Sequence, residues 1–164
     1  MAEKIKKTNA MRILDGLKIQ YETRDYDDDG EHELSRGAAV HAAEKLGIDV
    51  SSCFKTIVMR NEKKEIFVFL EQADKEINLK KARNVSSSKE LSPVKPEELL
   101  ALTGYVRGGC SPLGMKKKYP VFIDEVALTK EKIYISAGVR GKQIVIEPNL
   151  LVKASSALTA DLML

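Results

Sequence analysis

Five stretches of the chain are predicted as helices, mainly from the spacing of their hydrophobic residues. The first begins after Thr8, whose side chain can cap a helix, places Met11, Leu14 and Leu17 on one side, and ends at Gly16. Four more helices are predicted, and two of them start with a proline, which suits a first helical turn. Their starts are Ser35, Asn78, Pro96 and Pro148.

Six shorter stretches alternate or run continuously hydrophobic and are predicted as strands. They cover residues 18–26, 54–60, 66–71, 119–124, 132–136 and 142–147. The polar link between the second and third makes them a hairpin. Because helices and strands are mixed and several links are short, we predict an α+β fold with a mixed or antiparallel sheet. No internal repeat or linker divides residues 1–164, so a single domain is expected.

Composition narrows the class of protein. Hydrophobic residues make up 43% of the chain and aromatic residues only 5%, with no Trp, so we expect one aliphatic core. No apolar run approaches about 18 residues, and the charged N-terminus lacks the apolar segment of a signal peptide, so neither a membrane span nor export is expected. Cys53 and Cys110 give no disulfide framework and are expected to be reduced, in the cytoplasm. His32 and His41 are not at metal-ligand spacing with them, so we predict no metal and no other cofactor.

A glycine-rich stretch at residues 103–118 carries the clearest candidate chemistry. It holds four of the ten glycines. The pair Gly108–Gly109 lets a ligand approach the backbone, whose N–H groups can converge on an anion or a polarised carbonyl oxygen. Ser111 and Pro112 stiffen the turn, and three lysines follow. This pattern favours a site for a small polar group attached to something phosphorylated; a plain hairpin turn with a solvated lysine run is the open alternative.

The basic residues gather in the second half of the chain. The net charge of +3 is too small to indicate a partner, but six basic residues lie beside glycine-rich loops. They are Arg107, Lys116, Lys117, Lys118, Arg140 and Lys142. A local basic face fits modest nucleic-acid binding, and an ordinary solvated lysine face stays equally open. Lys55, among apolar neighbours at a strand start, either points into a pocket or snorkels at the strand edge.

Three sequence islands carry a family resemblance. They are FKT at 54–56, GYVRGGCSPLG at 104–114 with its lysine tail, and YISAG at 134–138 followed by Arg140–Gly141. In this order they resemble the YbaK/EbsC family of free-standing aminoacyl-tRNA deacylases, which are relatives of the editing domain inserted in bacterial prolyl-tRNA synthetases. The resemblance spans the chain from about Thr8 to Leu158 and implies a single α+β domain around a mixed, strongly curved, barrel-like sheet flanked by helices.

The resemblance also implies which residues form the site. Lys55 matches the active-site lysine, and Gly108 and Ser136 match residues of the catalytic pocket. Substrate-binding positions are expected around them, at Tyr26, Thr56, Gly109, Ser111 and Ala137. One departure concerns Gln143, where the family often has an aspartate. The amino-acid preference therefore stays open.

The implied reaction removes cysteine mischarged onto tRNA(Pro), and from tRNA(Cys), by cleaving the aminoacyl ester. The sequence offers no convincing protein nucleophile, because neither cysteine has a histidine near it. The resemblance implies instead that the substrate thiol attacks its own carbonyl, a step favoured by high effective molarity. Backbone N–H groups around Gly108–Gly109 and Ser136–Ala137 are the candidates for holding the oxyanion. Lys55 is expected to hold the terminal phosphate or ribose.

The implied partners are the acceptor end of tRNA(Pro), received by the six basic residues, and prolyl-tRNA synthetase. Phosphate contacts position an RNA without reading its sequence, so a synthetase would help to select the tRNA. Two alternatives remain: a deacylase for alanine or another small amino acid on tRNA(Pro), and a non-catalytic, EbsC-like binding or regulatory module.

Overall fold

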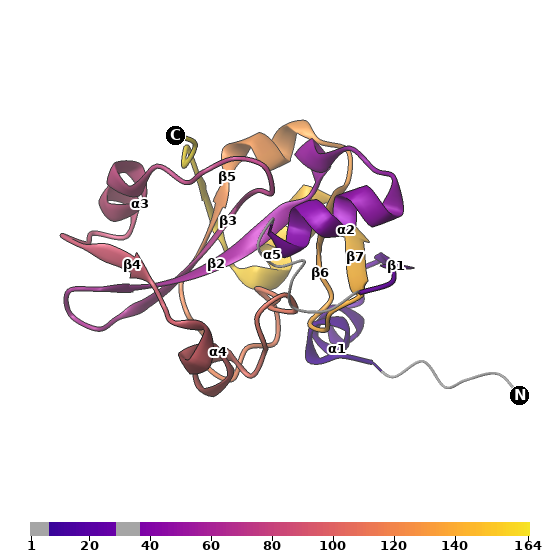
Figure 1. Ribbon diagram of the computed structural model, residues 1–164, viewed down its shortest axis with the longest axis horizontal. Helices are drawn as coiled ribbons and strands as arrows, with labels where there is room; N and C mark the ends of the chain where they lie inside the picture. Colours follow the sequence, from indigo (N-terminus) through magenta and orange to yellow (C-terminus); the bar gives the residue numbers. More distant parts are fainter. Residues whose placement is uncertain (1–6, 29–36) are drawn as a thin grey trace, which may run out of the picture.

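The computed structural model describes residues 7–28 and 37–164 (Figure 1). The helices are α1 (Asn9–Gly16), α2 (Ala38–Leu46), α3 (Leu79–Val85), α4 (Pro96–Thr103) and α5 (Pro148–Ser155), with 3-10 turns at Val50–Ser52 and Glu125–Thr129. The strands are β1 (Glu22–Asp25), β2 (Phe54–Asn61), β3 (Ile66–Gln72), β4 (Leu91–Pro93), β5 (Val121–Asp124), β6 (Ile133–Ser136), β7 (Lys142–Ile146) and β8 (Leu158–Ala160).

The described strands form two sheets. The larger has the order β4-β2-β3-β5-β8, in which β2 and β3 are an antiparallel hairpin and β5 pairs with β3 and β8 in parallel. The smaller has the order β1-β7-β6 and is antiparallel. An isolated parallel bridge between Cys53 and Tyr134 links the two. The predicted α+β class with mixed strand pairing is confirmed, and the predicted curved sheet is divided into two hydrogen-bonded parts.

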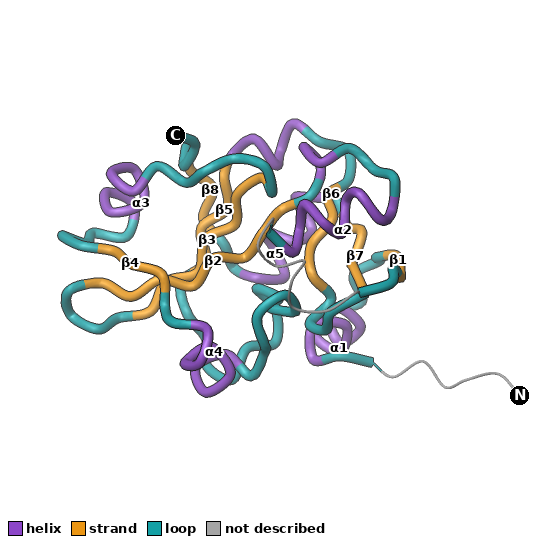
Figure 2. Tube along the Cα trace, viewed as in Figure 1, coloured by secondary structure: helices purple, strands orange, loops and turns teal. Residues whose placement is uncertain are grey.

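The core lies between and beside these sheets. The main buried cluster is largely aliphatic, as predicted, and combines Val58 and Leu70 of the larger sheet with Ile135 and Ile144 of the smaller one. Helix α1 covers it with Leu14, which is fully buried. A second cluster on the larger sheet contains Phe67, Phe69 and Phe122 and includes Ala82 of α3. Figure 2 shows the strands crossing the middle of the molecule with helices around them.

Most predicted elements are present, with differences at their ends. Thr8 caps α1 by accepting the Met11 N–H, and Gly104 ends α4 in a left-handed conformation. The strand predicted at 18–26 covers only Glu22–Asp25, and its predicted start belongs to the turn that ends α1: Lys18 has a φ of 58°, and its N–H donates to the Asp15 carbonyl. The predicted helix start at Ser35 and most of the acidic loop before it lie outside the described residues. Within the described ranges, no helix has the length and apolar character needed to cross a membrane.

Candidate functional site

A cavity of about 410 Å³ lies where β2 begins, beside the first turn of α2, the glycine-rich loop and the paired ends of β6 and β7. It brings together residues that are far apart in the sequence. Its lining includes Lys55, Thr56, Arg107, Gly108 and Ser136, all predicted site residues. The other lining residues are Gly37, Ala38, Ala39, Phe54, Ala73, Cys110 and Gln143.

Strand β2 supplies the side chains of Lys55 and Thr56. Lys55 is half-buried, and burial lowers its pKa, an effect opposed by the negative charges of two exposed acids after β3. Among the described residues Lys55 forms no ion pair. The Thr56 hydroxyl oxygen is buried and has no hydrogen-bond partner among the described residues. Because successive strand residues point to opposite faces and this oxygen is shielded from solvent, the Thr56 hydroxyl is not available to a ligand beside Lys55.

The glycine-rich loop presents its backbone to the cavity at Gly108, which has a φ of 87°. Gly109 packs on the next loop so closely that a Cβ there would lie 3.0 Å from the backbone of Val139 and Arg140. Its N–H donates to the carbonyl of Val106. The N–H of Gly108, like those of Arg107 and Cys110, makes no hydrogen bond with any described residue, so it is one of the loop donors left for a ligand.

Tyr105 anchors this loop and was not predicted as a functional residue. Its hydroxyl donates to the Leu113 carbonyl at 2.6 Å, and its ring lies so close to Gly138 that a Cβ there would be 2.8 Å from it. Burial raises the pKa of Tyr105 to about 12, so its proton is held in this hydrogen bond. The sequence signal that could have identified Tyr105 is its position in the glycine-rich stretch, because a tyrosine ring can pack closely against glycine backbone.

The loop after β6 is held from both sides. Ser136 accepts the N–H of Gly138 through its hydroxyl at 3.2 Å, while the N–H of Ala137 donates to the Lys142 carbonyl. The Ala137 carbonyl accepts the Thr8 hydroxyl. Ala137 is therefore buried and fully engaged, and it does not line the cavity. Ser111 is also fully buried, and its hydroxyl accepts the Leu113 N–H within its own turn.

Tyr26 does not line the cavity itself, but its hydroxyl is hydrogen-bonded to Gln143, which does. Gln143 is buried opposite Ser136 in the β6–β7 pairing and lines the cavity. Burial raises the pKa of the Tyr26 hydroxyl, opposed by hydrogen bonds from the Gly141 backbone and the Gln143 side chain. The Tyr26 ring also meets the edge of His41, with centroids 6.2 Å apart. Tyr26 thus orients a lining residue rather than forming the wall itself.

The six basic residues do not form one free surface. Arg107 lines the cavity and is exposed, whereas Lys117 and Lys118 line a separate groove of about 510 Å³ beside α1, next to the equally exposed Lys116. Acidic residues from β1 and the segment after it bind the other two. Arg140 makes two hydrogen bonds to Asp28, at 2.5 and 2.9 Å, and Lys142 lies 2.6 Å from Asp25.

Neither cysteine is prepared to act as a nucleophile. Cys110 lines the cavity, but burial raises its pKa to about 12. Burial likewise raises the pKa of Cys53 to about 12. Since the thiolate is the reactive form, both side chains are unreactive at neutral pH.

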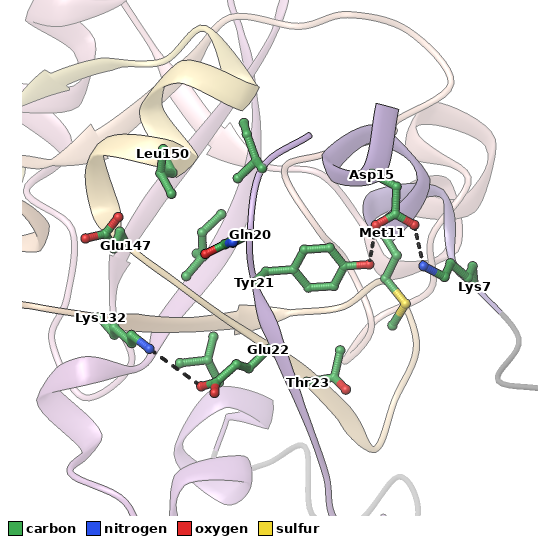
Figure 3. Close-up of a pocket in the computed structure, with 13 residues that line it drawn as sticks. Lys7, Met11, Asp15, Gln20, Tyr21, Glu22, Thr23, Lys132, Glu147 and Leu150 are labelled. Carbon is green, nitrogen blue, oxygen red and sulfur yellow. Dashed lines mark hydrogen bonds and ion pairs between the residues drawn. The ribbon is translucent and has the colours of Figure 1, made fainter. Parts of the chain in front are cut away.

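A larger cavity of about 790 Å³ lies between α1, β1 and α5 (Figure 3). No predicted site residue lines it. Its charged groups are largely satisfied by one another: Asp15 binds Lys7 at 2.5 Å and the Tyr21 hydroxyl at 3.0 Å, and Lys132 lies 3.7 Å from Glu22. Because its charges are paired with one another, the smaller cavity at Lys55 is the better candidate.

The chain is similar to several known proteins. Residues 35–154 match the family described as "Aminoacyl-tRNA editing domain". A protein of Enterococcus faecalis named "Putative Cys-tRNA(Pro)/Cys-tRNA(Cys) deacylase EbsC" is 36% identical over 95% of this chain and 93% of its own length. A proline–tRNA ligase of Trichlorobacter lovleyi is 28% identical over 65% of this chain and 18% of the ligase. The crystal structure of "a putative trans-editing enzyme for prolyl tRNA synthetase" superposes with a TM-score of 0.79 at 24% identity, covering 98% of this chain and 99% of the other.

The family match covers most of the chain, and the relative from Enterococcus faecalis spans nearly all of it. The fold is also that of the solved structure whose name is quoted above. The chain therefore belongs to the YbaK/EbsC family of aminoacyl-tRNA editing domains.

Proposed function

We propose that this protein is a free-standing, cytoplasmic deacylase that removes cysteine from mischarged tRNA(Pro) and, by the same chemistry, from tRNA(Cys). The observation that carries the proposal is the cavity at the start of β2, where Lys55, Gly108 and Ser136 meet. The name of the Enterococcus faecalis relative supports the choice of substrate. The cavity volume of about 410 Å³ falls in the range of small-molecule sites, which suits an aminoacyl group with part of its ribose.

The chemistry follows from what the cavity lacks and what it offers. Neither cysteine of the protein is ionised at neutral pH, which supports the route implied by the family resemblance, with the substrate thiol as the nucleophile. Its sulfur bonds to its own carbonyl carbon, the bond from that carbon to the ribose oxygen breaks, and the thiol proton ends on the ribose hydroxyl. The products are a cysteine thiolactone and free tRNA. Holding the aminoacyl group in the bent conformer supplies most of the rate enhancement.

Three groups of the protein act on this step. The free N–H of Gly108 donates to the oxyanion. The Lys55 ammonium, which has no ion-pair partner in the described chain, holds the terminal phosphate or ribose. Ser136 shapes the turn beside them through its hydrogen bond to Gly138.

The tRNA acceptor end is received by Arg107 at the cavity and by the exposed run Lys116, Lys117 and Lys118. Arg140 and Lys142 can contact the tRNA only if its phosphates replace Asp28 and Asp25 as their ion-pair partners. We therefore treat these two residues as secondary tRNA contacts. So few contacts bind RNA weakly and without sequence readout. We propose that prolyl-tRNA synthetase presents the mischarged tRNA, and the similarity to part of a proline–tRNA ligase supports that partnership.

A second candidate is removal of alanine or another small residue from tRNA(Pro). The observation that favours it is Gln143, a neutral amide lining the cavity, which selects no charged group. The test compares the loss of cysteine and of alanine from separately charged tRNA(Pro). Loss of cysteine alone supports the thiol route, loss of both supports a route through water or the ribose hydroxyl, and loss of neither supports a non-catalytic binding module.

A further inference from the structure

Three ionisable side chains lie side by side across the larger sheet, beginning at the cavity. Lys55 of β2 is directly opposite Glu71 of β3 in the antiparallel pairing. Glu71 in turn follows Leu70, which pairs with Ile123 of β5, so its neighbour on β5 is Asp124. Residues paired across neighbouring strands point to the same face, with Cβ atoms about 5 Å apart. Lys55, Glu71 and Asp124 therefore form one row that leads from the cavity wall into the protein.

The two acids of this row are buried. Glu71 is 0% exposed and Asp124 is 2% exposed. Two neighbouring carboxyl groups out of water cannot both ionise without a large electrostatic cost, so the pair retains one proton. The positions of these side chains indicate which of them carries it.

Asp124 has the environment of a carboxylate. Its Oδ1 accepts the Val126 N–H at 2.9 Å, and its Oδ2 accepts the Leu162 N–H at 3.3 Å. Glu71 differs: its Oε1 accepts the Gln72 N–H at 2.9 Å, but no donor among the described residues reaches its Oε2. A buried carboxyl oxygen without a donor suits the protonated O–H, which can donate to Asp124.

We propose that Glu71 is a positioning residue for Lys55: by keeping its proton against Asp124 it leaves the Lys55 ammonium unpaired and available to an anion in the cavity. The role of Lys55 in binding an anionic group of the substrate rests on the proposed function. The remaining charges near Lys55, Asp74 and Glu76 after β3, are exposed and screened by water. Consistently, burial and the hydrogen bond to Asp124 raise the pKa of Glu71 to about 8.

The proposal predicts a change at alkaline pH. Once Glu71 loses its proton, a carboxylate faces Lys55 across the strand pair and holds the ammonium in an ion pair. The nitrogen then binds its proton more tightly and is less available to a ligand. Replacing Glu71 by Gln keeps a neutral donor toward Asp124 and removes this change.

The test measures the rate at which an amine reagent, acetic anhydride, acetylates Lys55, read by peptide mass spectrometry. Wild type and Glu71→Gln are compared at about pH 6.5 and about pH 9.5. The expected ratio of variant to wild-type rate is about 1 at the lower pH and about threefold or more at the higher one, since only there is Glu71 charged. Exposed Lys63 on the hairpin turn serves as the internal control and should show equal rates throughout.

Two outcomes would overturn the proposal. Equal Lys55 rates at both pH values mean that Glu71 does not influence the amine, and a raised rate in the variant at both means that Glu71 is ionised throughout. If Glu71→Gln does not fold, carbon-13 NMR of labelled glutamate in the wild type decides, because the Glu71 carboxyl must titrate far above ordinary glutamates. None of these readouts requires deacylation, so failure of the proposed function and failure of this inference are distinguishable.

Discussion

Glu71→Gln should make the protein more stable by an amount that grows as the pH rises above about 4.5. Burial raises the pKa of Glu71 from 4.5 to about 8 in the folded chain. Below about pH 4.5 the folded and unfolded states both carry the proton, so the residue adds no pH dependence. Between about pH 4.5 and 8 the unfolded state loses the proton while the folded state retains it. Wild-type stability therefore falls as the pH rises through this window, and levels off above it.

The size of the effect follows from the width of the window. A separation of about 3.5 pH units at about 1.4 kcal/mol per unit gives an upper bound of about 5 kcal/mol. Relaxation of the site around the ionised carboxyl reduces this, so we expect about 2 to 4 kcal/mol at pH 9. Gln has nearly the same shape and can donate to Asp124, so the variant should match wild type at about pH 4.5 and exceed it at about pH 9.

The assay is urea unfolding of both proteins across this pH range, plotted as the difference in unfolding free energy. Other titrating groups cancel in the difference because they are common to both chains. Glu131→Gln, at an exposed position, is the matched control and should give a flat difference. A flat difference for Glu71→Gln as well would refute the assignment of a retained proton to this buried pair.

Three further predictions concern the loops and the RNA surface. Gly138→Ala should cost about 2 to 4 kcal/mol in urea unfolding, because its φ is 100° and the new Cβ would lie 2.8 Å from the Tyr105 ring; wild-type stability would contradict this packing. Cys110 should resist iodoacetamide at neutral pH in the folded protein and react after unfolding, since burial raises its pKa to about 12; rapid labelling of the native protein would contradict that. Deacylation at low tRNA concentration should weaken with salt, and replacing Lys117 and Lys118 by Ala should reduce the slope by up to about 2; an unchanged slope would remove these lysines from the RNA contact.

Local sequence patterns were enough to predict the elements that have strong local signals. The hairpin of β2 and β3 follows from two hydrophobic runs with a polar link, and α1 from Thr8 and the spacing of its hydrophobic residues. Strands β4 and β8 were missed because each has three residues, too few for a periodic pattern. The division into two sheets depends on long-range pairing, such as β1 with β7, which spacing does not encode.

The candidate site shows the same limit. The family resemblance singled out Lys55, Gly108 and Ser136, and the structure places all three on one cavity, while their roles stay predictions. Glu71 was missed, although an acid closing the apolar run of β3 was a usable signal once the hairpin register was counted. The pairing of Arg140 with Asp28 could not be foreseen, because the two are joined only by tertiary structure.

The most direct test of the central claim is the rate at which the purified protein removes labelled cysteine from tRNA(Pro), measured for wild type, Lys55→Ala and the exposed-site control Lys63→Ala. We predict rapid release by wild type and by the control, and release near the spontaneous rate for Lys55→Ala with its fold intact by circular dichroism. If Lys55→Ala retains most of the activity, the cavity at the start of β2 is not the editing site.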